Sequence, residues 1–217
     1  MSIADNIRQV RATLPEQVKL LCVSKYHTTD EILEAYVAGE RMFGESRAQE
    51  LEKKATTLPQ DIEWHFIGHL QRNKAKQVCR YASLIQSVDS WRLLEAIDKA
   101  AERCIDVLLE IHIAKEDTKT GLTQEDLQAL LEQYSSVKFQ HVRIRGLMGM
   151  ATLTGDEMEL KHEFRLLKTL FNDTKQRFFS NDASFDTLSM GMSDDYPIAV
   201  AEGSTMVRIG SRIFNTD

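Results

Sequence analysis

The sequence has little of what marks a membrane protein, a multidomain chain or a nucleic-acid-binding protein. Its 217 residues include only three prolines and ten glycines, and the formal net charge is -6. No apolar stretch approaches the roughly 18 residues that suggest a membrane span. The acidic balance also provides no broad positive surface for nucleic acid or an anionic membrane. We therefore expect a small-molecule ligand.

The cysteines and the N-terminus bear on the cellular compartment. Cys22, Cys79 and Cys104 are odd in number and contain no C-x-x-C pair, so we expect reduced thiols. The first residues, MSIADNIRQVRATL, are mixed and amphipathic, whereas a signal peptide needs an apolar core followed by small residues. Both features predict a cytoplasmic protein.

Eight short β-rich apolar segments recur along the chain, with stretches of helical periodicity between them. The segments are 18–24, 41–44, 63–68, 83–88, 106–113, 142–150, 185–191 and 206–210. Strands that are apolar on both faces indicate parallel pairing beneath helices, and eight such units favour a closed barrel. No linker rich in proline or glycine divides the chain. The sequence predicts an α/β fold, a single (β/α)8 TIM barrel that occupies residues 1–217 as one domain.

The two ends of the chain are expected to complete the barrel together. Only seven residues follow the eighth segment, which is too few for a closing helix, whereas residues 2–13 have the pattern of an amphipathic helix. We expect this extra N-terminal helix to fill the gap. A later helix is expected after Thr123, because Asp126 follows it at the spacing of a capping box.

Lys25 is the candidate reactive residue. It directly follows the first apolar segment, and the chemistry of such barrels gathers at the C-terminal ends of the strands. We expect partly desolvated surroundings at the barrel mouth, which would favour the neutral amine. A neutral lysine amine attacks carbonyl groups to form a Schiff base.

Two segments with small residues follow the seventh and eighth strands, where barrels often bind phosphate. The first runs from Ser189 to Asp195 before a short helix, and the second runs from Arg208 to Ser211. Small residues let backbone N–H groups approach an anion. Their joint position beside a strand-end lysine predicts a phosphate site.

Other charged residues have simpler interpretations. His65 and His69 have i,i+4 spacing but straddle a strand and its turn, so we expect no metal site. Asp194 and Asp195 are expected to serve the start of the following helix. A basic helix face, interpreted as solvated surface or as a surface that steers anions or partners, comprises Arg72, Lys74, Lys76 and Arg80.

Six motifs resemble, in order and spacing, those of the pyridoxal phosphate homeostasis proteins. They are SKYH at 24–27, FGES at 43–46, WHFIGHLQRNK at 64–74, GLMGM at 146–150, LSMGMSDD at 188–195 and VRIGSRIF at 207–214. The resemblance spans nearly the whole chain. It implies a barrel similar to the N-terminal domain of alanine racemase, which binds pyridoxal 5′-phosphate (PLP) without established catalytic activity and serves vitamin B6 and amino-acid balance.

The resemblance also implies roles for individual residues. Lys25 matches the Schiff-base lysine, and Arg208 matches an arginine that faces the pyridine nitrogen of PLP. The residues that hold the phosphate, largely through backbone N–H groups, match Ser189, Gly210 and Ser211, with Ser193 close by. Two further positions that line the cofactor match Ser46 and Met148. Family members commonly have Asn-Tyr where this chain has Ser46-Arg47, so a side-chain amide contact is not expected there.

The resemblance to a non-catalytic family agrees with the chemistry of Arg208. A guanidinium is a permanent donor, so it disfavours protonation of the pyridine nitrogen and weakens the ring as an electron sink. We expect no catalytic residues, a monomer, and at most transient contact with PLP-dependent enzymes. Two alternatives stay open: an amino-acid racemase of reduced form, which needs a base on each cofactor face, and a Schiff-base aldolase barrel that works without PLP.

Overall fold

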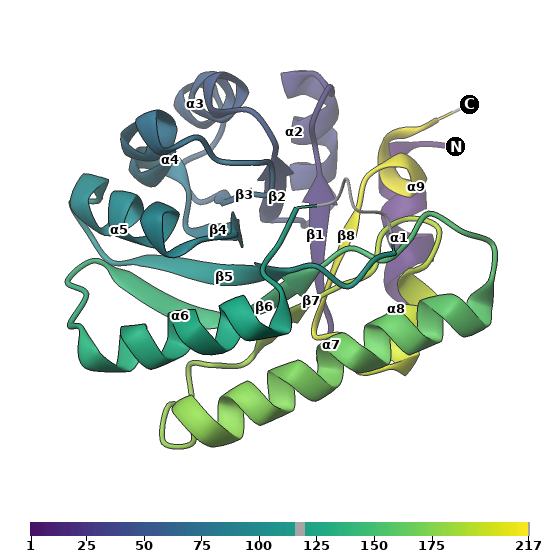
Figure 1. Cartoon of the computed structure of the whole chain (residues 1–217). Coiled ribbons are helices and arrows are strands. Elements are labelled where there is room, and N and C mark those ends of the chain that lie inside the picture. The colour runs from purple at the N-terminus through teal and green to yellow at the C-terminus, as the bar shows by residue number, and fades with distance from the viewer. Residues whose placement is uncertain (116–119, 217) are drawn as a thin grey trace.

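The computed structural model describes residues 1–115 and 120–216, whose eight strands pair in parallel to form a closed barrel (Figure 1). The strands are β1 (Lys19–Val23), β2 (Met42–Glu45), β3 (Glu63–Phe66), β4 (Leu84–Val88), β5 (Ile105–Ile111), β6 (Val142–Gly149), β7 (Thr187–Ser189) and β8 (Met206–Ile209). They follow chain order around the barrel, and β8 pairs with β1. The predicted (β/α)8 barrel is confirmed.

Helices cover the outside of the barrel (Figure 1). They are α2 (Thr29–Val37), α3 (Ala48–Thr57), the 3-10 helix η1 (Arg72–Lys74), α4 (Ala75–Tyr81), α5 (Trp91–Ala100), α6 (Gln124–Ser136), α7 (Glu157–Phe178) and α8 (Tyr196–Ala201). The expected capping box of α6 is present at Thr123 and Asp126. Among the described helices, none is both long enough and apolar enough to cross a bilayer.

The apolar core has two layers because side chains alternate along each strand. Leu20 and Cys22 of β1 belong to the large core between the strands and the helices, whereas Leu21 belongs to a second, smaller cluster. Strands β4, β5, β6 and β8 contribute the other members of this inner cluster, which are Leu84, Leu108, Met148 and Met206. The barrel interior is therefore filled by side chains, as in other barrels of this type.

Strand β7 is shorter than its sequence suggests. Only Thr187–Ser189 of the predicted segment 185–191 pair as a strand. Gly191 then adopts a φ of +96°, and a Cβ atom there would lie 2.7 Å from the Cβ atom of Ala199. The left-handed backbone conformation ends the strand and starts the loop that leads to α8.

The barrel is closed by helices from both ends of the chain. The expectation that the C-terminal residues are too few for a helix is wrong: α9 (Ser211–Phe214) forms one turn, anchored by its buried residues Ile213 and Phe214. The expected N-terminal helix, α1 (Ile3–Thr13), packs beside α9. Asn6 of α1 donates from Nδ2 to the carbonyl oxygens of Ile213 and Asn215 at 3.0 and 3.1 Å. The two termini consequently lie side by side (Figure 1).

Candidate cofactor-binding site

Lys25 lies in a tight turn after β1, at the C-terminal end of the barrel strands. The turn runs from Ser24 to His27, and the His27 N–H donates to the Ser24 carbonyl oxygen at 3.1 Å. Tyr26, the third residue of the turn, has a φ of +72° and is the one non-glycine residue of the described chain with a positive φ. Glycine is favoured at this position, so the turn holds strain of about 1–3 kcal/mol beside Lys25.

The expectation of a partly desolvated Lys25 is wrong, because the residue is exposed. The turn carries Lys25 past the buried end of β1, where its Nζ lies 5.9 Å from the centre of the Tyr26 ring. The guanidinium carbon of Arg47 lies 5.6 Å from the same ring centre. Two cations thus flank the Tyr26 ring at the barrel mouth, and the Lys25 amine is accessible from solvent.

A buried ion pair fixes the backbone next to Lys25. Lys54 Nζ lies 2.8 Å from Glu45 Oε1, and the two side chains are 4% and 1% exposed. Lys54 also donates to the Ser24 carbonyl oxygen at 3.0 Å, while the Ser24 hydroxyl donates to Glu45 Oε1 at 2.5 Å. A buried charge needs both its partner and additional hydrogen bonds. The pair therefore ties α3 and the end of β2 to the start of the Lys25 turn.

A cavity of about 480 Å³ opens beside this turn. The Lys25 turn, the start of α2, the end of β2 and one face of α3 line it. Strand β1 pairs with β2 on one side and with β8 on the other. Lys25 consequently stands between this cavity, which follows β2, and the loops that follow β7 and β8.

A chain of polar side chains crosses the barrel interior. Arg208, which is 4% exposed, donates from Nη1 to the carbonyl and hydroxyl oxygens of Ser189 at 2.9 and 2.7 Å. Its Nη2 donates to the Gly149 carbonyl oxygen at 3.0 Å. The Ser189 hydroxyl donates to Gln86 Oε1 at 2.7 Å, and Gln86 Nε2 lies 3.0 Å from His65 Nδ1. These contacts from five strands fix the guanidinium in one orientation.

Burial sets the charge states of this chain. It lowers the pKa of Arg208 to about 10, against the opposing effect of the Asp195 and Glu110 carboxylates, so the guanidinium is charged at neutral pH. It lowers the pKa of His65 to about 3, and Lys19 adds to the effect. The neutral His65 imidazole can accept the Gln86 N–H at Nδ1. Burial also raises the pKa of Glu110 and of Asp195.

The loops after β7 and β8 meet at Ser193 and Gly210. The Gly210 N–H donates to Ser193 Oγ at 3.4 Å, and Ser211 begins α9 directly afterwards. The N–H groups of Ser211 and Arg212 are in the first helical turn, which has no intrahelical acceptors for them. The Ser211 and Arg212 N–H groups and the Ser193 hydroxyl, which accepts from Gly210, thus lie where the two loops meet and can serve a small anion.

Two residues at the start of α8 make contacts away from the helix. Asp195 is the N-cap residue of α8 but makes no capping hydrogen bond; its Oδ1 accepts from the Met192 N–H at 2.6 Å and so fixes the preceding loop. Tyr196, the first residue of α8, is buried and its hydroxyl lies 2.8 Å from Thr13 Oγ1. That contact directs Tyr196 toward α1, because Thr13 is the last residue of that helix.

The remaining candidates, Met148 and Ser46, come from β6 and from the residue that follows β2. Met148 is 1% exposed within the inner apolar cluster. Ser46 is half-buried and lines the cavity that contains Lys25. Gly68 permits close contact here, because a Cβ atom at this position would lie 2.2 Å from the Ser46 carbonyl oxygen.

The predicted residues thus form neighbouring groups at one end of the barrel. Lys25 and Ser46 share the cavity, Ser193, Gly210 and Ser211 form the anion cradle, and Ser189 lies deeper with Arg208. Sequence reasoning missed Gln86, Glu45 and Lys54. Gln86 in the apolar segment SLIQSV was the available signal, because a polar residue inside a buried strand needs a partner.

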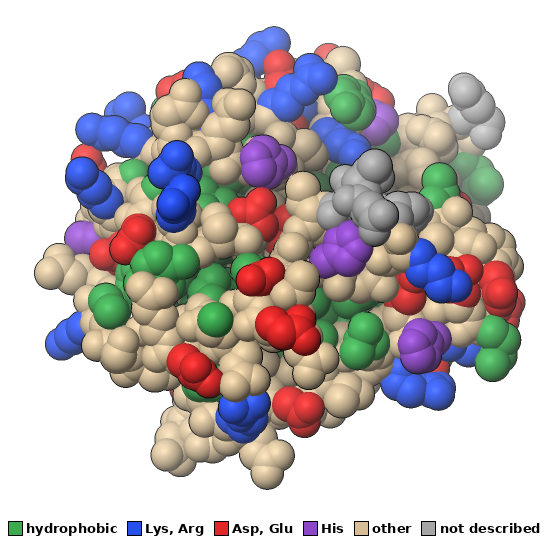
Figure 2. Space-filling model, in the orientation of Figure 1, with side chains coloured by type: hydrophobic (Ala, Val, Ile, Leu, Met, Phe, Trp, Pro, Cys, Tyr) green, Lys and Arg blue, Asp and Glu red, His purple; other side chains and the backbone are tan. Residues whose placement is uncertain are grey.

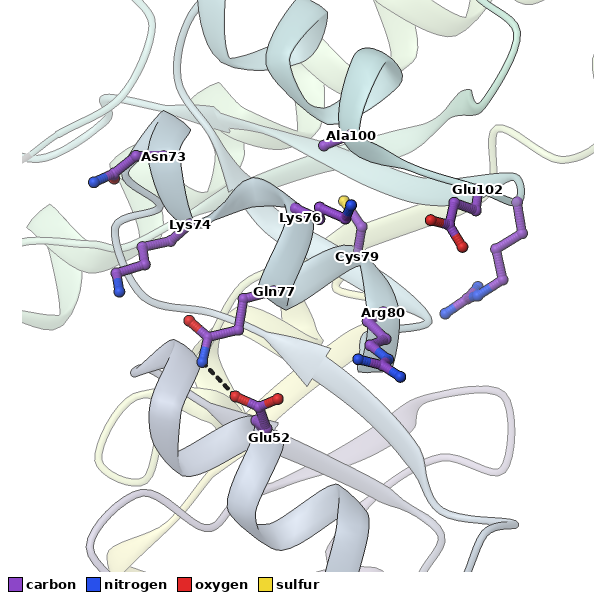
Figure 3. Close-up of a pocket in the computed structure, with 10 residues that line it drawn as sticks. Glu52, Asn73, Lys74, Lys76, Gln77, Cys79, Arg80, Ala100 and Glu102 are labelled. Atoms are coloured by element: carbon purple, nitrogen blue, oxygen red, sulfur yellow. Dashed lines mark hydrogen bonds between the residues drawn. The ribbon is translucent and has the colours of Figure 1, made fainter.

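A larger cavity lies elsewhere, on the outside of the barrel beside α4 (Figure 3). Its volume is about 730 Å³, and its basic lining residues include Lys74, Lys76 and Arg80 of the predicted basic face. Figure 2 shows Lys and Arg side chains over this region of the surface.

His65 and His69 have different partners. His65 contacts Gln86 inside the barrel, whereas His69 pairs with Asp89 at 3.5 Å. The described residues contain no cluster of three potential metal ligands.

Comparisons with known proteins agree with this geometry. The family model "Alanine racemase, N-terminal domain" matches residues 1–216. The pyridoxal phosphate homeostasis protein of Pasteurella multocida is 36% identical over 99% of this chain and 97% of its own length. The structure of PipY from Synechococcus elongatus without PLP is 40% identical, with a TM-score of 0.91 over 98% of this chain and 100% of that chain. PipY with PLP bound has a TM-score of 0.89 over the same shares.

Proposed function

Because this chain belongs to the family of the pyridoxal phosphate homeostasis proteins, within the alanine racemase N-terminal domain family, we propose that it binds PLP as a Schiff base on Lys25. The observation that carries the proposal is the position of Lys25 at the end of β1, between a cavity and an anion cradle. PLP has an aldehyde and a phosphate, and a Schiff base needs the amine beside the first and donors beside the second.

The described residues fit PLP. Arg208 has five N–H groups, of which three donate to Ser189 and Gly149, so two lack an acceptor among the described residues. One of them can donate to the pyridine nitrogen. Ser193, Gly210 and Ser211 supply donors for the phosphate. Met148 and Ser46 would line the cofactor, as the resemblance implies.

Ser189 also acts on PLP through Arg208 in this proposal. Its hydroxyl already donates to Gln86 and accepts from Arg208, so it is occupied. The phosphate contact that the resemblance implies for Ser189, largely through backbone N–H groups, stays part of the proposal. Its hydroxyl would in addition orient the Arg208 guanidinium.

We propose that the protein stores PLP and does not turn over an amino acid. When bound, PLP supplies an electron sink, which is strongest when its pyridine nitrogen is protonated. Arg208 remains a charged donor and opposes that protonation. A racemase also needs a base on the opposite face, but Tyr196 points to Thr13 and Tyr26 is 77% exposed. These contacts favour storage over the racemase alternative.

The cellular role follows from storage. We propose that the barrel acts as a cytoplasmic monomer in vitamin B6 homeostasis and amino-acid balance, with transient contact to PLP-dependent enzymes that receive the cofactor. An exposed Lys25 suits such exchange, because an amine from another molecule could reach the carbon atom through which PLP would be joined to Lys25.

The test compares Lys25→Ala with Lys76→Ala, which removes an exposed lysine beside the outer cavity. Wild-type protein and Lys76→Ala should develop a visible absorption band with PLP that borohydride abolishes. Lys25→Ala should develop none while keeping the thermal stability of the wild type. A band of full strength in Lys25→Ala would refute the assignment.

A further inference from the structure

The cavity beside Lys25 extends beyond the residues that PLP would need. From Lys25 and Ser46 it continues along α3 to Arg47, Glu50 and Lys53. The anion cradle follows β8, on the other side of β1. The Lys25 turn thus has a possible anion site on each side, and the one along α3 has no role in the proposed function.

The charges along this part of the cavity are unbalanced. Glu45 and Lys54 neutralise each other in their buried pair. Lys25, Arg47 and Lys53 then face one acidic residue, Glu50. Neither Arg47 nor Lys53 has a side-chain hydrogen bond or ion pair with any described residue. Free cations in a protein with a net charge of -6 attract anions locally against the overall field.

Arg47 does not serve the helix that it precedes. It is the N-cap residue of α3 and makes no side-chain capping bond, because a guanidinium has no acceptor. Its charge also lies at the positive end of the helix, where cations are unfavourable. Its nearest described aromatic contact is the exposed ring of Tyr26, beside Lys25. Arg47 is thus available to a ligand, at a cost to the helix.

We propose that Arg47 and Lys53 form an outer capture site for the phosphate group of incoming PLP. The inference rests on the proposed function of Lys25. The capture site raises the local concentration of PLP beside the amine, and the phosphate then moves to the cradle of Ser193 and Gly210. The step is non-covalent, so the capture site speeds association and leaves release from the cradle unchanged.

The experiment measures PLP association by stopped-flow absorbance in the variants Arg47→Asn and Lys53→Gln and in the double variant. Asn restores a capping side chain at α3, so Arg47→Asn should fold at least as well as the wild type. The double variant should associate about tenfold more slowly at low ionic strength, with the difference shrinking in salt. Lys76→Gln/Arg80→Gln, at the outer cavity, is the matched control and should leave the rate unchanged.

Pyridoxal, which lacks the phosphate, separates capture from effects on the amine. Its association rate should be equal in the wild type and the double variant. The capture site would be overturned if the double variant slowed the association of pyridoxal and PLP equally, or if it left the PLP association rate unchanged. It would also be overturned if the whole effect of the double variant were a faster release of PLP. Failure of the wild type to develop the Lys25 band would instead overturn the proposed function, so the two failures are distinct.

Discussion

The cavity beside Lys25 and the outer cavity beside α4 both have basic linings among the described residues, and the larger, outer one is the less suited to chemistry. The outer cavity beside α4 has about 730 Å³, while the cavity beside Lys25 has about 480 Å³. In the outer cavity Glu52 accepts a hydrogen bond from Gln77 at 2.6 Å. The polar lining of this cavity comes from helix surfaces and from Glu102 and Arg103, which follow α5 (Figure 3). The smaller cavity adjoins a strained turn, a buried ion pair and the end of β1.

The difference lies in what supports the side chains. The buried polar groups near Lys25 and Arg208 hold one another: Glu45 and Lys54 hold Ser24, and Ser189 and Gln86 hold Arg208. Such supporting contacts fix the geometry that a cofactor needs. By volume alone the outer cavity would be the better candidate for a cofactor site. The position at the strand ends and the buried polar partners favour the cavity at Lys25 instead.

The strongest test of this comparison removes one supporting group. Lys54→Met leaves the Glu45 carboxylate buried without its partner, so we expect a loss of about 3–5 kcal/mol in the free energy of unfolding. Lys76→Met in the outer cavity should change it by less than about 0.5 kcal/mol. Denaturant titration measures both values. Similar small losses for both variants would remove the distinction between the two cavities.

The next test uses pH. Burial lowers the pKa of His65 to about 3, below its unfolded value near 6.5, so between these values only the unfolded state binds the proton. The stability from this residue is complete above pH 6.5 and is lost as the pH falls toward 3. From pH 7 to pH 5 the loss should be about 2 kcal/mol.

His65→Gln should remove that part of the pH dependence, since glutamine does not titrate. Denaturant unfolding at pH 7 and pH 5 measures the difference, and His69→Gln is the exposed control. An equally steep loss in His65→Gln would show that another group causes the acid sensitivity.

The smallest expected effect is a gain. Arg47→Asn supplies the missing cap of α3 and removes a cation from the positive end of the helix, so stability should rise by about 1 kcal/mol. A thermal melt without PLP measures it. A clear fall in the melting temperature would mean that Arg47 has a structural role that its described contacts do not reveal.

The sequence was sufficient for the barrel and for the residues at strand ends. Lys25, Ser193 and Gly210 follow apolar segments, and the barrel fold alone brings such positions to one face. The buried partners could not be predicted in the same way. Lys54 reaches Glu45 from α3, and Gln86 reaches Ser189 across the barrel, so these contacts depend on strand register and helix placement.

The exposure of Lys25 was also beyond the sequence pattern, because Lys25 lies in the tight turn after β1, where Tyr26 has a positive φ. The direction of Tyr196 depends similarly on where α1 packs, since its hydroxyl contacts Thr13. Local apolar patterns report which residues are in a strand, but not how a turn directs the next side chain.

Borohydride reduction of the PLP-loaded protein, followed by peptide mass spectrometry, tests the central claim most directly. Reduction fixes PLP covalently to whichever lysine forms the Schiff base. We expect the added mass on the peptide that contains Lys25, and none on peptides that contain Lys53, Lys74 or Lys76. A modified lysine elsewhere, with Lys25 unmodified, would contradict the account.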